Sequence, residues 1–171
     1  MVDIVFYQSI SYIAVALGVC LAAIDYTVSQ RWQNKNRKTT VTTNIINPFY
    51  TKENALLYDQ LNKMEWKDFN DFTSKYDSRV NPENWAVRHY FWGAYDVLGY
   101  QWKEGLVDIG LISRLTGGRI ELTWKRFGPI IKEYRKTDWS EDRYKDFEDL
   151  ARELIKIRER REPKRSFGLG G

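Results

Sequence analysis

Few side chains in this sequence have the types and spacing that catalysis or metal binding requires. The single histidine, His89, could shuttle a proton or bind a metal, because imidazole titrates near neutral pH. A metal site needs companion ligands, and the single cysteine, Cys20, is distant in the sequence and lies in an apolar run. We therefore interpret His89 as a structural residue of the fold.

Two carboxylate pairs, Glu141-Asp142 and Glu148-Asp149, could in principle do acid–base work. Both lie in the expected first turns of a helix, where the helix macrodipole alone favours acids. The pair Gly117-Gly118 lacks the lysine and the preceding strand of a phosphate-binding loop, and the sequence has no HExxH motif. We predict no catalytic residue, no cofactor and no metal site, and we expect the protein not to be an enzyme.

A candidate for macromolecular binding is the stretch LVDIGLISRLTGGRIELTWKRFG, residues 106–128. A helix, a glycine turn and a second helix that carries bases are typical of a helix-turn-helix. An ordinary helical hairpin fits equally well, because Ile120 and Trp124 would be buried and Glu121 would lie among the bases that face phosphate. We therefore keep a membrane-tethered nucleic-acid-binding protein only as the alternative function. We do not expect nucleic acid to be the partner. The bases concerned are Arg119, Lys125 and Arg126.

The composition predicts a folded domain with an appendage. The chain has 171 residues, a net charge of +4 and 15% aromatic residues, more than a disordered chain would carry. The appendage is the apolar segment, residues 4–24, which contains no charged side chain. As a helix it would be roughly 31 Å long, close to the ~30 Å of a bilayer's hydrocarbon core.

We interpret the apolar segment as an uncleaved transmembrane helix. A core helix of a small domain would be shorter and would carry a polar stripe. A removed signal peptide is the remaining alternative, but it needs a basic start, and only the amino terminus and Asp3 precede the apolar run. The positive-inside rule places the N-terminus outside and the body in the cytoplasm. The bases that follow the segment, and that we expect at the membrane surface, are Arg31, Lys35, Arg37 and Lys38.

One face of this helix could pack against another membrane helix. Ala14, Gly18 and Ala22 form a ladder of small residues at intervals of four, which permits close helix approach, although such ladders also arise by chance. The partner would be a second copy of the chain or another membrane subunit. The complete predicted face is Ser11, Ala14, Gly18, Ala22 and Asp25.

The rest of the chain predicts an all-α fold, a small cytoplasmic helical bundle over residues 41–161 followed by a flexible tail at 162–171. Residues 1–38 hold the transmembrane helix and its basic exit. Pro48 is placed to start a helix, a second short helix covers 65–76, and Asn81 with Pro82 starts an apolar central helix. That helix ends at Gly105.

Three helices are expected after Gly105. A short helix near 108–115 ends at Gly117-Gly118, and a longer one follows, with a kink or break at Gly128-Pro129. The last helix begins at Ser140, buries one narrow stripe and pairs Glu148 with Arg152 on its exposed side.

The stretches KEGLVDIGLISRL (103–115) and ELTWKRFGPIIKEYRK (121–136), behind an N-terminal apolar helix, resemble an uncharacterised prokaryotic family known as a domain of unknown function. The resemblance covers most of residues 5–150 and implies a single-pass membrane protein, with no catalytic residues to carry over. We therefore expect a protein of the cell membrane that acts by contact, as a self-associating scaffold or as an accessory subunit of a larger membrane complex.

Overall fold

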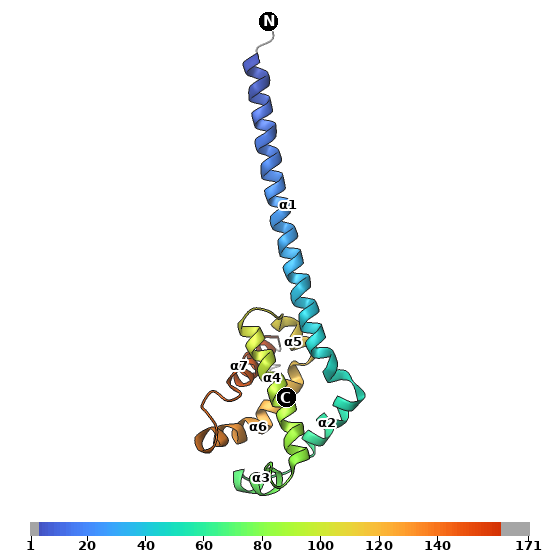
Figure 1. Cartoon of the computed structure of the whole chain (residues 1–171), viewed down its shortest axis with the longest axis vertical. Coiled ribbons are helices and arrows are strands. Elements are labelled where there is room, and N and C mark those ends of the chain that lie inside the picture. The colour runs from blue at the N-terminus through green and yellow to red at the C-terminus, as the bar shows by residue number, and fades with distance from the viewer. Residues whose placement is uncertain (1–3, 162–171) are drawn as a thin grey trace, which may run out of the picture. The chain divides into compact units, whose positions relative to one another are not determined.

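The structure is a computed structural model, and it describes residues 4–161. The described residues form helices and no strand, so the predicted all-α class, an apolar N-terminal helix followed by a helical domain, is confirmed. The chain divides into two compact units, Met1–Lys38 and Thr39–Gly171. The predicted tail, 162–171, lies outside the described residues. Figure 1 labels the elements, which are α1 (Ile4–Ile46), the 3-10 helix η1 (Asn47–Tyr50), α2 (Lys52–Asn62), α3 (Phe69–Tyr76), α4 (Pro82–Lys103), α5 (Ile109–Leu115), α6 (Gly117–Thr137) and α7 (Lys145–Arg161).

Side-chain caps define the starts of four helices of the helical domain (residues 39–161), namely α2, α3, α4 and α5. The Asn81 side chain accepts a hydrogen bond from the backbone N–H of Asn84, and Pro82 takes the first position of α4, as predicted. Pro48 does not start α2: it lies in η1, and α2 begins after Thr51, which caps it. Helix α3 starts at Phe69 rather than near residue 65, because Asp68 supplies its cap.

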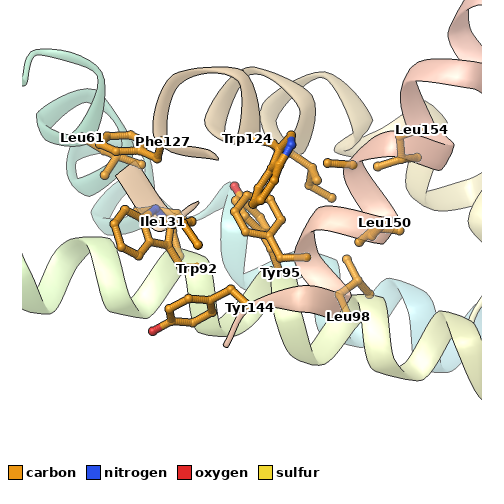
Figure 2. Packing of buried hydrophobic residues seen from close by; sticks show 14 of the residues in the cluster. Leu61, Trp92, Tyr95, Leu98, Trp124, Phe127, Ile131, Tyr144, Leu150 and Leu154 are labelled. Atoms are coloured by element: carbon orange, nitrogen blue, oxygen red, sulfur yellow. The ribbon is translucent and has the colours of Figure 1, made fainter. Parts of the chain in front are cut away.

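The core of the helical domain is aromatic and is organised around α4, whose largest contact is with α7. Figure 2 shows side chains of α4 pointing toward side chains of α6 and α7. The rings lie at the separations of favourable edge-on and tilted pairs, such as the 5.3 Å between the centroids of Tyr95 and Phe147. Buried members of this cluster include Phe91, Trp92, Tyr95, Leu98, Trp124, Phe127, Phe147 and Leu150.

Helix α6 differs from the prediction at both of its glycine sites. Gly117 begins α6, so the glycine pair starts a helix and α5 ends before it. The helix also continues through Pro129, so the predicted break is wrong. Proline removes one backbone hydrogen bond, but Phe127 and Ile131 are fully buried beside it, and this packing holds the helix together. Gly128 leaves room for the indole of Trp124, which lies 2.9 Å from where a Cβ would stand.

Helix α7 also begins later than predicted, at Lys145 instead of Ser140. The backbone of Tyr144 has a φ of 58°, a left-handed conformation that a non-glycine residue rarely adopts, and it separates the preceding turn from the helix. The Tyr144 side chain is buried in the aromatic core, which supplies the energy for this strained position. The predicted pair of Glu148 with Arg152 forms, but Glu148 is buried and does not lie on the exposed side.

Gly99 allows the close approach of α4 to the start of α7, because a Cβ there would collide with the carbonyl oxygen of Asp146. We predict that Gly99→Ala lowers the free energy of unfolding by about 1–3 kcal/mol, the usual cost of overpacking. The free energy of unfolding is measured by urea titration of the full chain in detergent micelles, with tryptophan fluorescence as the signal.

Gly93→Ala is the matched control, because Gly93 lies in the same helix and a Cβ there meets nothing within 4 Å. Alanine is the better helix former, so this variant should be neutral or more stable by up to about 1 kcal/mol. Equal destabilisation by the two substitutions would show that the α4–α7 contact is not as close as described.

Candidate functional site

Helix α1 exposes an apolar surface that the described chain does not cover. The side chains of residues 10–29 are all exposed, among them large apolar ones such as Val19 and Leu21. An 18-residue window of the helix has a mean hydropathy of 1.7, and none of it is buried. The helix is therefore long and apolar enough to cross a membrane.

The structure places the predicted packing face on this exposed helix. Each of its members, Ser11, Ala14, Gly18, Ala22 and Asp25, is exposed. A Cβ added to Gly18 would meet nothing within 4 Å, so a second helix could approach its backbone. The predicted membrane-surface bases, Arg31, Lys35, Arg37 and Lys38, lie further along the same helix and are also exposed. Lys35 lies over the ring of Trp32, 5.6 Å from its centroid.

His89 lies in an aromatic cluster of the helical domain. Its ring centroid is 4.2 Å from that of Trp85 and 5.7 Å from that of Trp139, and its Nδ1 contacts the hydroxyl of Tyr144. Burial lowers the pKa of His89 to about 4, and the charges of Arg88 and Arg143 act in the same direction. The imidazole is therefore neutral at physiological pH. Over residues 4–161, no three His, Cys, Asp or Glu side chains are grouped to hold a metal ion.

A cavity of about 400 Å³ adjoins His89. Its walls come from the loop before α4, from α4 itself and from the end of α6 and the turn after it. Sequence reasoning missed its buried member, Arg88. The signal was present, because Asn84, Arg88, Phe91 and Tyr95 recur at spacings of four, three and four, which places an arginine on the core face of α4.

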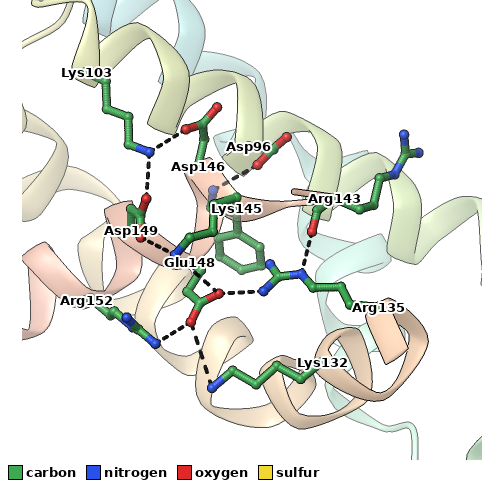
Figure 3. Close-up of polar contacts among 11 residues, drawn as sticks. Asp96, Lys103, Lys132, Arg135, Arg143, Lys145, Asp146, Glu148, Asp149 and Arg152 are labelled. Carbon is green, nitrogen blue, oxygen red and sulfur yellow. Dashed lines mark hydrogen bonds and ion pairs between the residues drawn. The ribbon is translucent and has the colours of Figure 1, made fainter. Parts of the chain in front are cut away.

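Glu148 is the centre of a charged cluster that joins α6 to α7 (Figure 3). Its side chain is 4% exposed and lies 2.6 Å from Nη1 of Arg135 on α6. Burial opposes ionisation, but the hydrogen bond from Arg135 and the charges of Lys145 and Arg152 outweigh it, so the pKa of Glu148 lies below its usual value. The acids at the start of α7 are thus held by specific bases, and the macrodipole alone does not explain them as we had interpreted.

The same end of α7 is tied to α4. Nζ of Lys103 lies 2.6 Å from carboxylate oxygens of both Asp146 and Asp149, and the Asp96 carboxylate accepts a 2.9 Å hydrogen bond from the backbone N–H of Phe147 (Figure 3). The other predicted carboxylate pair, Glu141-Asp142, is exposed in the turn before α7. These contacts hold the start of α7 against α4.

The predicted helical hairpin is built into the core. Arg119 donates a 2.7 Å hydrogen bond to the carbonyl of Phe49, and Arg126 donates to the carbonyl of Met64. Glu121 is buried, with Nε of Arg158 3.2 Å away. Two of the three bases proposed for nucleic acid thus bind the chain's own backbone, whereas Lys125 is exposed.

The described residues form an all-α domain that follows an exposed apolar helix. The chain belongs to the family described as a domain of unknown function (DUF4760), whose sequence model matches residues 12–154. The predicted resemblance to an uncharacterised family is thereby confirmed. The match includes much of the apolar segment together with the helical domain. No curated protein and no solved structure matches the chain.

We predict that acid weakens the fold through His89. The unfolded chain takes up a proton near a pKa of about 6.5, whereas folded His89 stays neutral down to about pH 4. Between these values the unfolded state binds more protons, so the free energy of unfolding falls as the pH falls. Because His89 is partly exposed, we expect a loss on the order of 1–2 kcal/mol from about pH 7 to about pH 4.5.

Urea unfolding of the wild type and of His89→Gln should be measured at a series of pH values. The difference between the two proteins separates the contribution of His89 from that of the carboxylates. The variant should lose less stability over the same range. If both proteins show the same pH dependence, His89 is not held neutral by the fold.

Proposed function

We propose that this protein is a single-pass membrane protein, anchored by α1 with its N-terminus outside, whose cytoplasmic helical domain acts by contact and not by catalysis. The observation that carries the proposal is the apolar, entirely unburied stretch of α1. Apolar surface of this extent on one helix is unfavourable in water, at about 25 cal/mol per Å². Insertion into a bilayer removes this cost.

Two rival explanations of the apolar segment fit less well. A core helix of a soluble domain would be mostly buried, and none of the apolar window is buried. Cleavage of a signal peptide after the apolar run would remove residues from 12 onward that the family shares. The exposed bases after the segment support a cytoplasmic domain.

An exposed stripe on α4 supports a role in protein contact. Tyr90, Val97 and Tyr100 are exposed apolar residues, and with Ala86 and Gly93 they follow spacings of four and three, the pattern of a helix that pairs with another helix. In an antiparallel pair centred on Gly93, Ala86 would face Tyr100 of a second copy, and Tyr90 would face Val97. The small Ala86 then opposes the large Tyr100 of the second copy, which favours self-association over an accessory role.

The native Cys20 tests the anchor directly. It lies in the middle of the exposed apolar stretch and is the single cysteine of the chain. We predict that a membrane-impermeant maleimide does not label Cys20 in intact or in permeabilised cells, because the thiol lies in the hydrocarbon. Detergent solubilisation should make it reactive.

Two variants in a Cys20→Ser background test the orientation. Asp3→Cys should react in intact cells, and Lys52→Cys, at the start of α2, should react only after permeabilisation. Labelling of Lys52→Cys from outside would invert the topology, and labelling of native Cys20 in permeabilised cells without detergent would remove the anchor.

Self-association is tested at the small-residue face of α1. We predict that the purified full chain is a homo-oligomer in detergent and that Gly18→Leu weakens its association at least about tenfold, because a large side chain blocks close helix approach. Val19→Leu is the control, since it keeps a large apolar residue on another face. Analytical ultracentrifugation measures both. A monomeric wild-type protein that copurifies with other subunits would favour the accessory role instead.

A further inference from the structure

Arg88 on α4 is a buried cation that forms no ion pair with a described carboxylate. The residue is 1% exposed, and its guanidinium carbon lies 4.6 Å from the ring centroid of Phe72 and 5.4 Å from that of Trp92. Its guanidinium donates to the carbonyl of Tyr76 and to the hydroxyl of Tyr134, whereas Nε has no hydrogen-bond partner. Over residues 4–161, no carboxylate lies within ion-pairing distance of this guanidinium.

The other buried charges of the helical domain are compensated. Glu148 has bases on two helices, and Glu121 has Arg158. Burial lowers the pKa of the Arg88 guanidinium, yet arginine remains charged in proteins. A buried and unpaired charge is costly, so a group that brings a negative charge to Arg88 would be stabilising.

Arg88 lines the cavity of about 400 Å³ described above, which has the size of a small-molecule site. A second arginine, Arg79, and the hydroxyl-bearing Tyr134 line it as well. Its aromatic walls include Trp85, which packs on His89, and Trp139, whose ring is stacked 4.4 Å from that of Tyr134. The cavity therefore combines guanidinium groups with flat aromatic surfaces.

Two acids, Asp77 and Asp138, also line the cavity, and each accepts a hydrogen bond from a residue of its own turn. Oδ1 of Asp77 accepts a 3.1 Å hydrogen bond from the backbone N–H of Arg79. Oδ2 of Asp138 accepts a 3.2 Å hydrogen bond from the hydroxyl of Thr137. Neither carboxylate forms an ion pair with Arg88, and the charge of Asp77 acts on the guanidinium only from a distance.

We infer that this cavity binds a small organic oxyanion, a carboxylate or phosphate carried on a planar ring, whose charge pairs with Arg88 and whose ring lies against Trp85 and Trp139. A guanidinium presents parallel N–H donors that match the oxygens of either group. An indole face accepts a planar ring by stacking. The inference is independent of membrane anchoring, because all of these residues belong to the helical domain.

The test uses the full chain in detergent micelles, with phenyl phosphate and benzoate as probes and isothermal titration calorimetry as the readout. We expect at least one probe to bind saturably at one site per chain. Benzyl alcohol, which has the ring without the charge, should not bind measurably. Inorganic phosphate, which has the charge without the ring, should bind at least tenfold more weakly than phenyl phosphate.

Arg88→Met provides the decisive variant, because methionine keeps an unbranched side chain in the core and removes the charge. It should abolish binding while the protein remains folded by circular dichroism and is no less stable to urea than the wild type without ligand. Arg143→Met, which removes an exposed arginine from outside the cavity, should leave the affinity unchanged.

Three outcomes would overturn the inference. Binding of benzyltrimethylammonium in place of the anions would show that Asp77 and Asp138 dominate the cavity. Anion binding that persists in Arg88→Met would place the site elsewhere. Absence of binding by both anionic probes, together with a large loss of stability in Arg88→Met, would show that the charge of Arg88 is already compensated within the chain.

Discussion

The structure depends on one physical constraint: the apolar surface of α1 is unfavourable in water and must be covered. The helical domain has its own aromatic core, and none of the apolar window of α1 is buried. A chain with such a surface must bury it in a bilayer or against another molecule. The apolar segment is long enough to span the hydrocarbon core of a bilayer, which is the environment that we propose for it.

The domain that follows is stabilised by a few specific contacts around α4. Gly99 permits close backbone approach to α7, and Lys103 and Glu148 secure the start of α7 to α4 and α6. The same domain carries the exposed stripe of α4 and the cavity beside Arg88.

The sequence predicted most helices because their periodicity and caps are local signals, as at Asn81 and Pro82. It failed where tertiary contacts override local preference. Pro129 stays within a helix because the core holds the residues around it, and the turn before α7 is set by the buried ring of Tyr144. The exposed face of α1 was predictable from composition, whereas the cavity joins residues from three separate segments. Its one signal in the sequence was the spacing that places Arg88 on the buried face of α4.

The most direct measurement of the central claim is alkaline carbonate extraction of the native protein from its own cells, with the N-terminal residue of the recovered chain determined by mass spectrometry. We predict that the chain stays in the membrane pellet and retains its first residues. Recovery in the aqueous supernatant, or a chain that begins after the apolar segment, would contradict the account.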